Sequence, residues 1–173
     1  NTKNLITCII GGENNHYNFS KENTFDLCER IKKIKNYNNN KEILVITSRR
    51  TNQEIKHILK KELKSISTLW FGEGNNPYEF ALYNSSYFII TSDSTSMISE
   101  ASISGKPIYV YQLPMKRKSK RFIRFHEEFK KMNITRDFNT LDKLENWTYT
   151  KLEESKRIAG IIKKRIIERK NES

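Results

Sequence analysis

The chain has 173 residues, two cysteines and three histidines, and a domain of this length buries about 70% of its unfolded surface without disulfides. Two distant cysteines and three scattered histidines provide too few ligands for a metal site, and no run approaches the roughly 18 apolar residues of a membrane-spanning helix. The net charge of +12 favours anionic partners, but the signatures of nucleic-acid-binding domains are absent, so nucleic acid is not an expected partner.

Short apolar runs alternate with amphipathic segments from one end of the chain to the other. Strands are predicted over residues 5–10, 42–47, 67–71, 87–91 and 107–111. Helices are predicted from about Ser20, after a capping box at 51–54, over about 77–83 with Asn76 as N-cap, between 92 and 105, over about 122–132 and over 150–170. This alternation is typical of a doubly wound α/β domain, in which helices cover both faces of a parallel sheet.

The cysteines and the two ends of the chain lead to further expectations. Cys8 falls in the first predicted strand and Cys28 in the first predicted helix, so both are expected to be buried, reduced thiols of an intracellular, cytoplasmic protein. The first four residues resemble neither a signal peptide nor an initiation site, so residues 1–173 are interpreted as a single domain that is a fragment. The helix over 150–170 is expected to pack against a neighbouring domain that the chain lacks.

Polar side chains gather where the predicted strands end. Ligands of open parallel sheets bind at the carboxyl ends of the strands, near the point where the strand order reverses. Four clusters occupy such positions: Gly11 and Gly12; Ser48, Arg49 and Arg50; Asn75, Asn76 and Tyr78; and Ser92, Asp93, Ser94, Thr95 and Ser96. We therefore expect a ligand-binding site at this edge of the sheet.

Three of these clusters have both a functional and a structural interpretation. Arg49 and Arg50 suit a phosphate or carboxylate through bidentate hydrogen bonds, or they are ordinary solvated charges. The loop from Gly72 to Tyr78 contacts a nucleobase or serves only as a helix cap. Two consecutive glycines form part of a binding loop or only a tight turn.

The segment from Thr91 to Pro107 is the most informative of the four. It places several hydroxyl side chains at the start of a short helix between two buried strands, with Glu100 about one turn inside. A helix N-terminus carries unpaired N–H groups and about half a positive charge, which suits a diphosphate, and Glu100 can then bind a ribose. The alternative is an ordinary hydroxyl cap followed by a surface carboxylate.

Candidate acid or base groups are Glu13, His16 and Asp93, and no two of them form a recognisable catalytic pair. No Ser-His-Asp arrangement, P-loop or metal-binding helix is visible in the sequence. The catalytic residues are therefore not assigned.

Charge is concentrated in one basic run, which consists of Lys116, Arg117, Lys118, Lys120, Arg121 and Arg124. One interpretation is the solvated start of a helix whose aromatic side packs on the sheet. Another is a surface that binds an anionic membrane or a lipid headgroup. Binding to RNA or DNA is the least favoured of the three.

Four motifs resemble one known family in their order and spacing: GGENNHYNF at Gly11, ITSRRT at Ile46, NNPYEFAL at Asn75 and TSDSTSMISEASISGKPIYVY at Thr91. They are similar to the mitochondrial-fission protein family of the elongated-mitochondria type, over roughly residues 5–138. That family is similar to the C-terminal, donor-binding half of GT-B glycosyltransferases. The resemblance implies a Rossmann-like domain and a missing N-terminal domain, which usually carries the acceptor site and the catalytic base.

The resemblance also implies a function. Ser99 and Glu100, followed by Gly105 and Pro107, are similar to the donor site of the GT-B transferase that adds N-acetylglucosamine to the lipid-linked peptidoglycan precursor. By this resemblance Glu100 binds the ribose of a uridine nucleotide, and the helix start at Ser92 meets the diphosphate. The expected ligand is a nucleoside-diphosphate sugar, UDP-linked, without a tightly bound metal or cofactor. The isolated domain is expected to bind this ligand but not to turn it over.

One departure and two alternatives remain open at this point. Asp93 stands where that transferase has a glycine, and its carboxylate repels a diphosphate unless a cation, Arg49 or Arg50 offsets the charge. The first alternative is a non-catalytic adaptor that keeps the fold and acts peripherally at a membrane through the basic run, as plant members of the family are thought to do. The second is an epimerase of GT-B shape that acts on nucleotide sugars.

Overall fold

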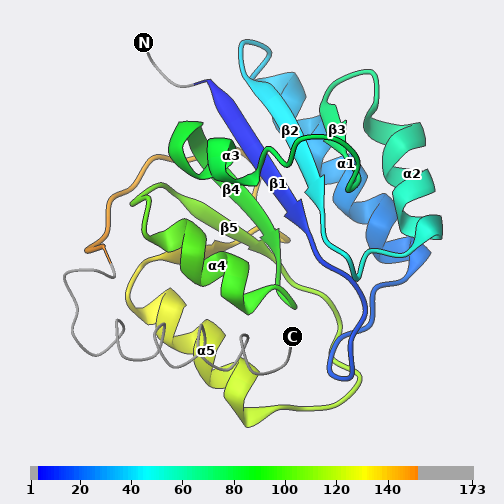
Figure 1. Cartoon of the computed structure of the whole chain (residues 1–173). Helices are drawn as coiled ribbons and strands as arrows, with labels where there is room; N and C mark the ends of the chain where they lie inside the picture. The colour runs from blue at the N-terminus through cyan, green and yellow to red at the C-terminus, as the bar shows by residue number, and fades with distance from the viewer. Residues whose placement is uncertain (1–3, 152–173) are drawn as a thin grey trace.

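Six parallel strands form one sheet within residues 4–151, the part of the chain that the computed structural model describes (Figure 1). The strands are β1 (Leu5–Ile10), β2 (Glu42–Thr47), β3 (Thr68–Trp70), β4 (Ser85–Thr91), β5 (Ile108–Tyr111) and β6 (Thr135–Asp137). Their order is β3-β2-β1-β4-β5-β6, so the strand order reverses between β1 and β4. The predicted doubly wound, Rossmann-like α/β fold is confirmed.

Helices cover both faces of this sheet. One face carries α1 (Lys21–Tyr37) and α2 (Gln53–Leu63). The other face, which is turned toward the viewer in Figure 1, carries α3 (Tyr78–Asn84), α4 (Thr95–Ser102) and α5 (Lys120–Lys131). The sheet is therefore a central layer with an apolar core on each side.

The central strand β1 shows how the sequence fills both cores. Successive side chains of a strand point to opposite faces. Ile6, Cys8 and Ile10 belong to the core under α1 and α2, whereas Ile9 packs in the core that contains Phe125 of α5. A parallel strand buried on both faces appears in the sequence as a continuous apolar run, which is why the bounds of β1 and β2 were predicted correctly.

The start of α2 differs from the prediction, which placed a capping box at residues 51–54. The N-cap is Asn52, whose side-chain oxygen accepts a hydrogen bond from the backbone N–H of Ile55. Thr51 is buried instead, and its hydroxyl donates to the carbonyl of Gly11 over 2.5 Å. The predicted capping role of Thr51 was wrong because this hydroxyl joins the ends of β1 and β2.

The start of α3 also lies one residue later than predicted. Pro77 occupies the N-cap position without a side-chain cap, and Asn76 accepts a hydrogen bond from the backbone N–H of Tyr78. By contrast, the predicted start of α1 at Ser20 is confirmed, because Ser20 and Asn23 form a reciprocal capping box.

The strand β6 was not predicted from the sequence. It has three residues, Thr135–Asp137, and two of them are polar and partly exposed, so it lacks the apolar pattern of the inner strands. The chain then runs to Trp147, which meets Tyr109 edge to face at 5.1 Å. The predicted helix over 150–170 lies, from residue 152 onward, outside the described residues.

Both cysteines are buried free thiols, as predicted. Burial raises the pKa of Cys28 to about 12 and raises the pKa of Cys8 as well. Neither thiol is therefore activated as a nucleophile.

Candidate functional site

The Gly11–Gly12 turn follows β1 at the point where the strand order reverses. The backbone N–H of Gly11 donates to the hydroxyl of Thr91 over 2.8 Å, and that of Gly12 donates to Oδ2 of Asp93 over 3.0 Å. A Cβ on Gly11 would lie 2.0 Å from Asp93 Oδ2, and one on Gly12 would lie 2.1 Å from the carbonyl oxygen of Arg50. Both positions thus require glycine because neighbouring atoms approach so closely.

Asp93 is held by an ion pair at this turn. Its side chain is fully buried, and its Oδ2 lies 2.8 Å from Nη2 of Arg50. The same guanidinium donates through Nη1 to the carbonyl of Gly12 over 3.0 Å. Burial, and then the charge of Asp93, raises the pKa of the nearby Tyr17 to about 12. Arg50, one of the two arginines expected to offset Asp93, is thus the one that pairs with it.

The predicted hydroxyl cluster at the start of α4 is largely turned inward. Ser92, Ser94 and Thr95 are buried, and Ser96 is partly exposed. The Ser92 hydroxyl accepts a hydrogen bond from the backbone N–H of Leu113 over 2.9 Å. Ser94 occupies the N-cap position of α4 but makes no side-chain cap. Ser92 therefore links β4 to the segment after β5.

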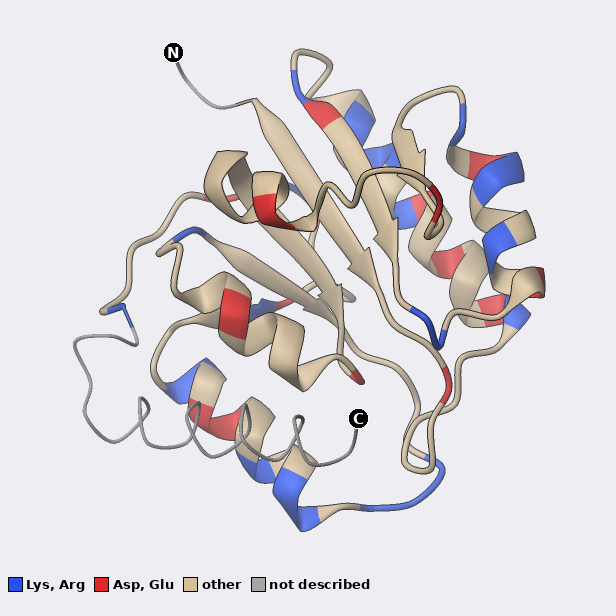
Figure 2. Cartoon of the chain, viewed as in Figure 1, with Lys and Arg blue, Asp and Glu red and all other residues tan. Residues whose placement is uncertain are grey.

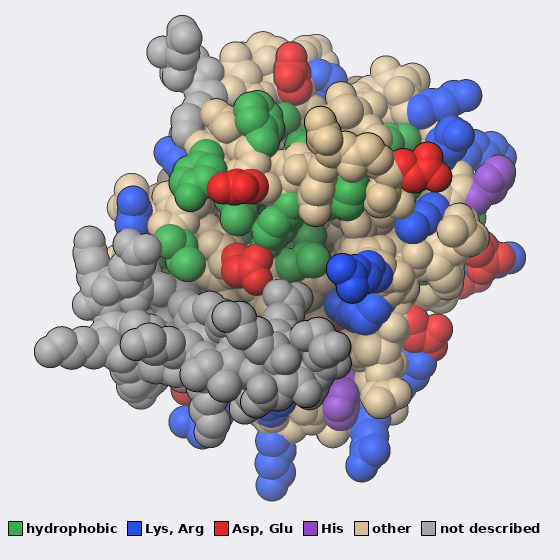
Figure 3. Space-filling view, viewed as in Figure 1, with side chains coloured by type: hydrophobic (Ala, Val, Ile, Leu, Met, Phe, Trp, Pro, Cys, Tyr) green, Lys and Arg blue, Asp and Glu red, His purple; other side chains and the backbone are tan. Residues whose placement is uncertain are grey.

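A cleft of about 800 Å³ lies beside this turn, at the carboxyl ends of β2 and β3. Its lining comes from both strands, from the loops that follow them, and from α2, α3 and α4: Ile46, Thr47, Ser48, Arg49, Arg50, Lys56, Trp70, Phe71, Gly72, Asn76, Tyr78 and Met97. Figure 3 shows hydrophobic side chains gathered over α3 and α4, with acidic ones among them and basic ones beside them. The cleft therefore combines aromatic walls with positive charge, and none of its lining residues is acidic.

The three cations of the cleft have different partners. Arg50 is paired with Asp93, and Lys56 donates to the carbonyl of Phe71 over 3.2 Å. Arg49 is exposed and has no ion-pair partner within residues 4–151. Arg49 and Lys56 are therefore the cations of the cleft that no carboxylate of the described chain neutralises.

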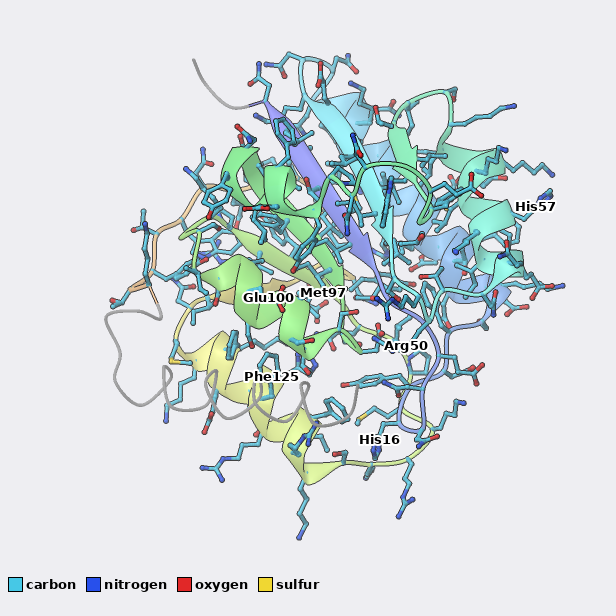
Figure 4. All side chains as sticks on the ribbon, in the orientation of Figure 1. His16, Arg50, His57, Met97, Glu100 and Phe125 are labelled. Carbon is cyan, nitrogen blue, oxygen red and sulfur yellow. The ribbon has the colours of Figure 1, made fainter. Side chains whose placement is uncertain are left out.

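Glu100 lies beside the cleft on α4. In Figure 4, Met97 and Glu100 are neighbours on the outer side of this helix, and Arg50 lies beyond the start of the same helix. The phenol of Tyr78 donates to Oε2 of Glu100 over 2.5 Å, which places the carboxylate next to the cleft wall. Glu100 is partly exposed rather than enclosed.

The indole N–H of Trp70 is buried and has no hydrogen-bond partner in the described part of the chain. Trp70 lines the cleft from the end of β3. An unpaired buried donor is destabilising, so Trp70 is a feature of the cleft that packing alone does not explain.

The basic run lies at the loop before α5 and on its first turns, where Figure 2 shows a concentration of Lys and Arg. The backbone N–H of Lys116 donates to the carbonyl of His16 over 2.9 Å, so the run begins against the loop after β1. Its six basic residues are all exposed, and so is Ile123 among them.

The candidate acid or base groups do not come together. Glu13 pairs with Lys116, and the ring of His16 packs on Phe122 with 5.1 Å between centroids. Among the described residues no group of three or more His, Cys, Asp or Glu side chains could hold a metal ion. No described helix is long and apolar enough to cross a membrane.

Comparison with known proteins decides the family. The model of the mitochondrial fission ELM1 family matches residues 1–166. The chain belongs to this ELM1 family. This ELM1-family chain is 37% identical over 168 residues to an uncharacterized protein, RP120, of Rickettsia prowazekii. The aligned region covers 93% of the chain and 46% of that relative. It is 27% identical over 130 residues to the mitochondrial fission protein ELM1 of Arabidopsis thaliana. This aligned region covers 73% of the chain and 30% of that relative. The chain thus spans less than half the length of either relative.

In this ELM1-family chain the structure brings only some predicted site residues into the cleft. Ser48, Arg49, Arg50, Asn76 and Tyr78 line it. The others form the glycine turn, the start of α4 or the adjoining surface: Gly11, Gly12, Asn75, Ser92, Asp93, Ser94, Thr95, Ser96 and Glu100.

The predicted site residues left out several lining residues of the ELM1-family cleft, among them Lys56, Trp70, Phe71 and Met97. Trp70 and Phe71 end a predicted strand, so the rule that named the other clusters could have found them. Lys56 lies in α2 and Met97 in α4, and in the sequence they look like an ordinary helix cation and an apolar helix position.

Proposed function

We propose that this ELM1-family chain binds a nucleoside-diphosphate sugar in the cleft, as the donor-binding half of a GT-B-type glycosyltransferase. The observation that carries the proposal is the lining of the cleft, which joins Trp70, Phe71 and Tyr78 to three basic side chains without an acidic one. Aromatic faces stack on nucleobases, and arginine and lysine bind phosphate oxygens. A volume of about 800 Å³ is within the usual range for small-molecule sites.

The surroundings of the cleft support this class of ligand. Glu100 is held at the wall by Tyr78, and a carboxylate there can accept hydrogen bonds from ribose hydroxyls. Arg49 and Lys56 can stabilise the negative charge that develops on a departing diphosphate. Because the chain spans less than half of its relatives, sugar transfer is proposed for the full-length protein only.

A binding screen tests the proposal. Full-length protein is titrated calorimetrically with the uridine, guanosine, cytidine and adenosine diphosphates and their sugar derivatives. We expect selective binding to one base and a loss of about tenfold in Arg49→Gln and in Lys56→Gln, which corresponds to about 1.4 kcal/mol each. Arg117→Gln, an exposed arginine outside the cleft, is the matched control. Absence of binding across the panel, or equal losses in all three variants, contradicts the proposal.

The second candidate function is that of a non-catalytic adaptor at an anionic membrane. The basic run supports it, because its six cations are exposed and Ile123, which lies between Arg121 and Arg124 in the sequence, is 37% exposed. Basic side chains attract anionic headgroups, and an apolar side chain among them can enter the interface. Sedimentation with phosphatidylserine vesicles should then show salt-sensitive binding that Lys120→Glu/Arg121→Glu/Arg124→Glu abolishes, whereas Arg49→Gln leaves it unchanged.

A further inference from the structure

Three different donors converge on a single oxygen of Asp93. Oδ2 accepts from the backbone N–H of Gly12 over 3.0 Å and from the hydroxyl of Ser94 over 3.3 Å, and it lies 2.8 Å from Nη2 of Arg50. A backbone N–H of a glycine turn, a hydroxyl at a helix start and a guanidinium are the donors that proteins commonly direct at a phosphate oxygen. Asp93 thus sits among donors suited to an external anion.

The carboxylate also fills the space at the turn. Its side chain is fully buried, and only the missing Cβ of Gly11 leaves room for Oδ2. Its second oxygen, Oδ1, is buried and has no hydrogen-bond partner among the residues described. The backbone N–H of Gly11 is already used by Thr91. Neither N–H of the turn therefore remains for a ligand while Asp93 keeps this position.

We infer that Asp93 is an internal anion that occupies the anion-binding position of the Gly11–Gly12 turn, and that the ligand's own anionic group binds Arg49 and Lys56 instead. The first half of this inference stands on the geometry of the turn alone. The second half rests on the proposed function of the cleft. Asp93 is then a specificity-determining residue, because it moves the anionic group from the turn into the cleft.

Two variants remove the internal anion in different ways. Asp93→Asn keeps the shape and an acceptor for the Gly12 N–H but loses the charge, and Asp93→Gly also empties the space. Inorganic pyrophosphate is titrated into full-length wild-type and variant protein by calorimetry. We expect pyrophosphate affinity to rise at least about tenfold in both variants, because both release the charge of Arg50 and Asp93→Gly also frees the Gly12 N–H. Adding Arg50→Gln to Asp93→Gly should remove the gain, and adding Arg49→Gln should not.

The outcomes separate this inference from the proposed function. If folded Asp93→Asn and Asp93→Gly proteins gain no pyrophosphate affinity, Asp93 is only a structural partner of Arg50 and the inference is overturned, even if the wild type binds a nucleoside diphosphate. A gain for pyrophosphate without binding of any nucleoside diphosphate supports the internal anion and contradicts the proposed ligand. Should both Asp93 variants fail to fold, the arginine variants Arg49→Gln and Arg50→Gln decide. Relative to the wild type, the affinity for the nucleoside diphosphate should fall about tenfold in Arg49→Gln and less than about twofold in Arg50→Gln. The reverse order overturns the inference.

Discussion

Tyr78 and Glu100 join two helices that no backbone hydrogen bond connects. The phenol of Tyr78 in α3 donates to the carboxylate of Glu100 in α4 over 2.5 Å, and both side chains are partly exposed. We expect Tyr78→Phe and Glu100→Gln each to lower the free energy of unfolding by about 1 kcal/mol, because each weakens a charge-assisted hydrogen bond. Urea denaturation of both single variants and the double variant measures this. A coupling energy near zero contradicts a direct stabilising contact.

Arg50 and Arg49 are neighbours in the sequence, but we expect their substitution to affect stability to different extents. Arg50→Gln leaves the buried Asp93 without its ion-pair partner. Such a change costs about 3–5 kcal/mol in a dry interior, and we expect about 2 kcal/mol because the Arg50 side chain is 41% exposed. Arg49→Gln should change the free energy of unfolding by less than about 0.5 kcal/mol. Urea denaturation curves that show equal losses for the two variants would contradict the ion pair as the main role of Arg50.

The close approach of Gly11 to Asp93 predicts a compensating pair of substitutions. Gly11→Ala places a methyl group where Oδ2 of Asp93 lies, at a separation of 2.0 Å. We expect a loss of about 2–3 kcal/mol, the usual cost of overpacking a filled site. Asp93→Gly in the same protein should restore part of the loss. Thermal unfolding of the two single variants and the pair provides the measurement, and strictly additive losses would show that the two positions do not interact.

The buried thiols and phenols predict a loss of stability at alkaline pH. Burial raises the pKa of Cys28, Tyr17 and Tyr109 to about 12, whereas in an unfolded chain a thiol ionises near about 8.5 and a phenol near about 10. Above about pH 8.5 the unfolded state therefore binds fewer protons than the folded state, and the free energy of unfolding falls as pH rises toward 12.

Urea denaturation between about pH 8 and pH 11 checks this prediction. We expect the free energy of unfolding to be highest at the lower end of this range and to fall steadily as the pH rises. Cys28→Ala should lower stability near neutral pH through the cavity it creates, and it should also flatten the decline. A free energy of unfolding that is constant over this range contradicts the prediction.

The inner part of the fold could be predicted because burial leaves a clear pattern. β1 and β2 are apolar on both faces, so each is a continuous run between polar loops. β6 has three residues and only Thr135 is buried, so nothing in its sequence distinguishes it from a loop. The start of α2 was misplaced because Thr51 and Asn52 are both suitable caps, and tertiary contact with Gly11 decides between them.

The sequence indicates where in the fold the candidate site residues lie, but it does not reveal which contacts each side chain makes. The rule that ligands bind at strand ends selected Arg49 and Tyr78, and both line the cleft. It could not show that Asp93 turns inward to Arg50 and Gly12, because this depends on three loops that are distant in sequence. Nor could it show that Ser92 bonds to Leu113, which makes a predicted ligand hydroxyl part of the framework.

The two strands at the edges of the sheet, β3 and β6, have three residues each, whereas β4 beside the centre has seven. A short edge exposes few unpaired backbone groups to a strand of another molecule, and Arg136 adds a charge to β6. Edge-to-edge growth into larger β-assemblies is therefore unfavourable for this sheet. The two edges of the described sheet therefore disfavour pairing with a strand of a second molecule, although its inner strands are strongly apolar.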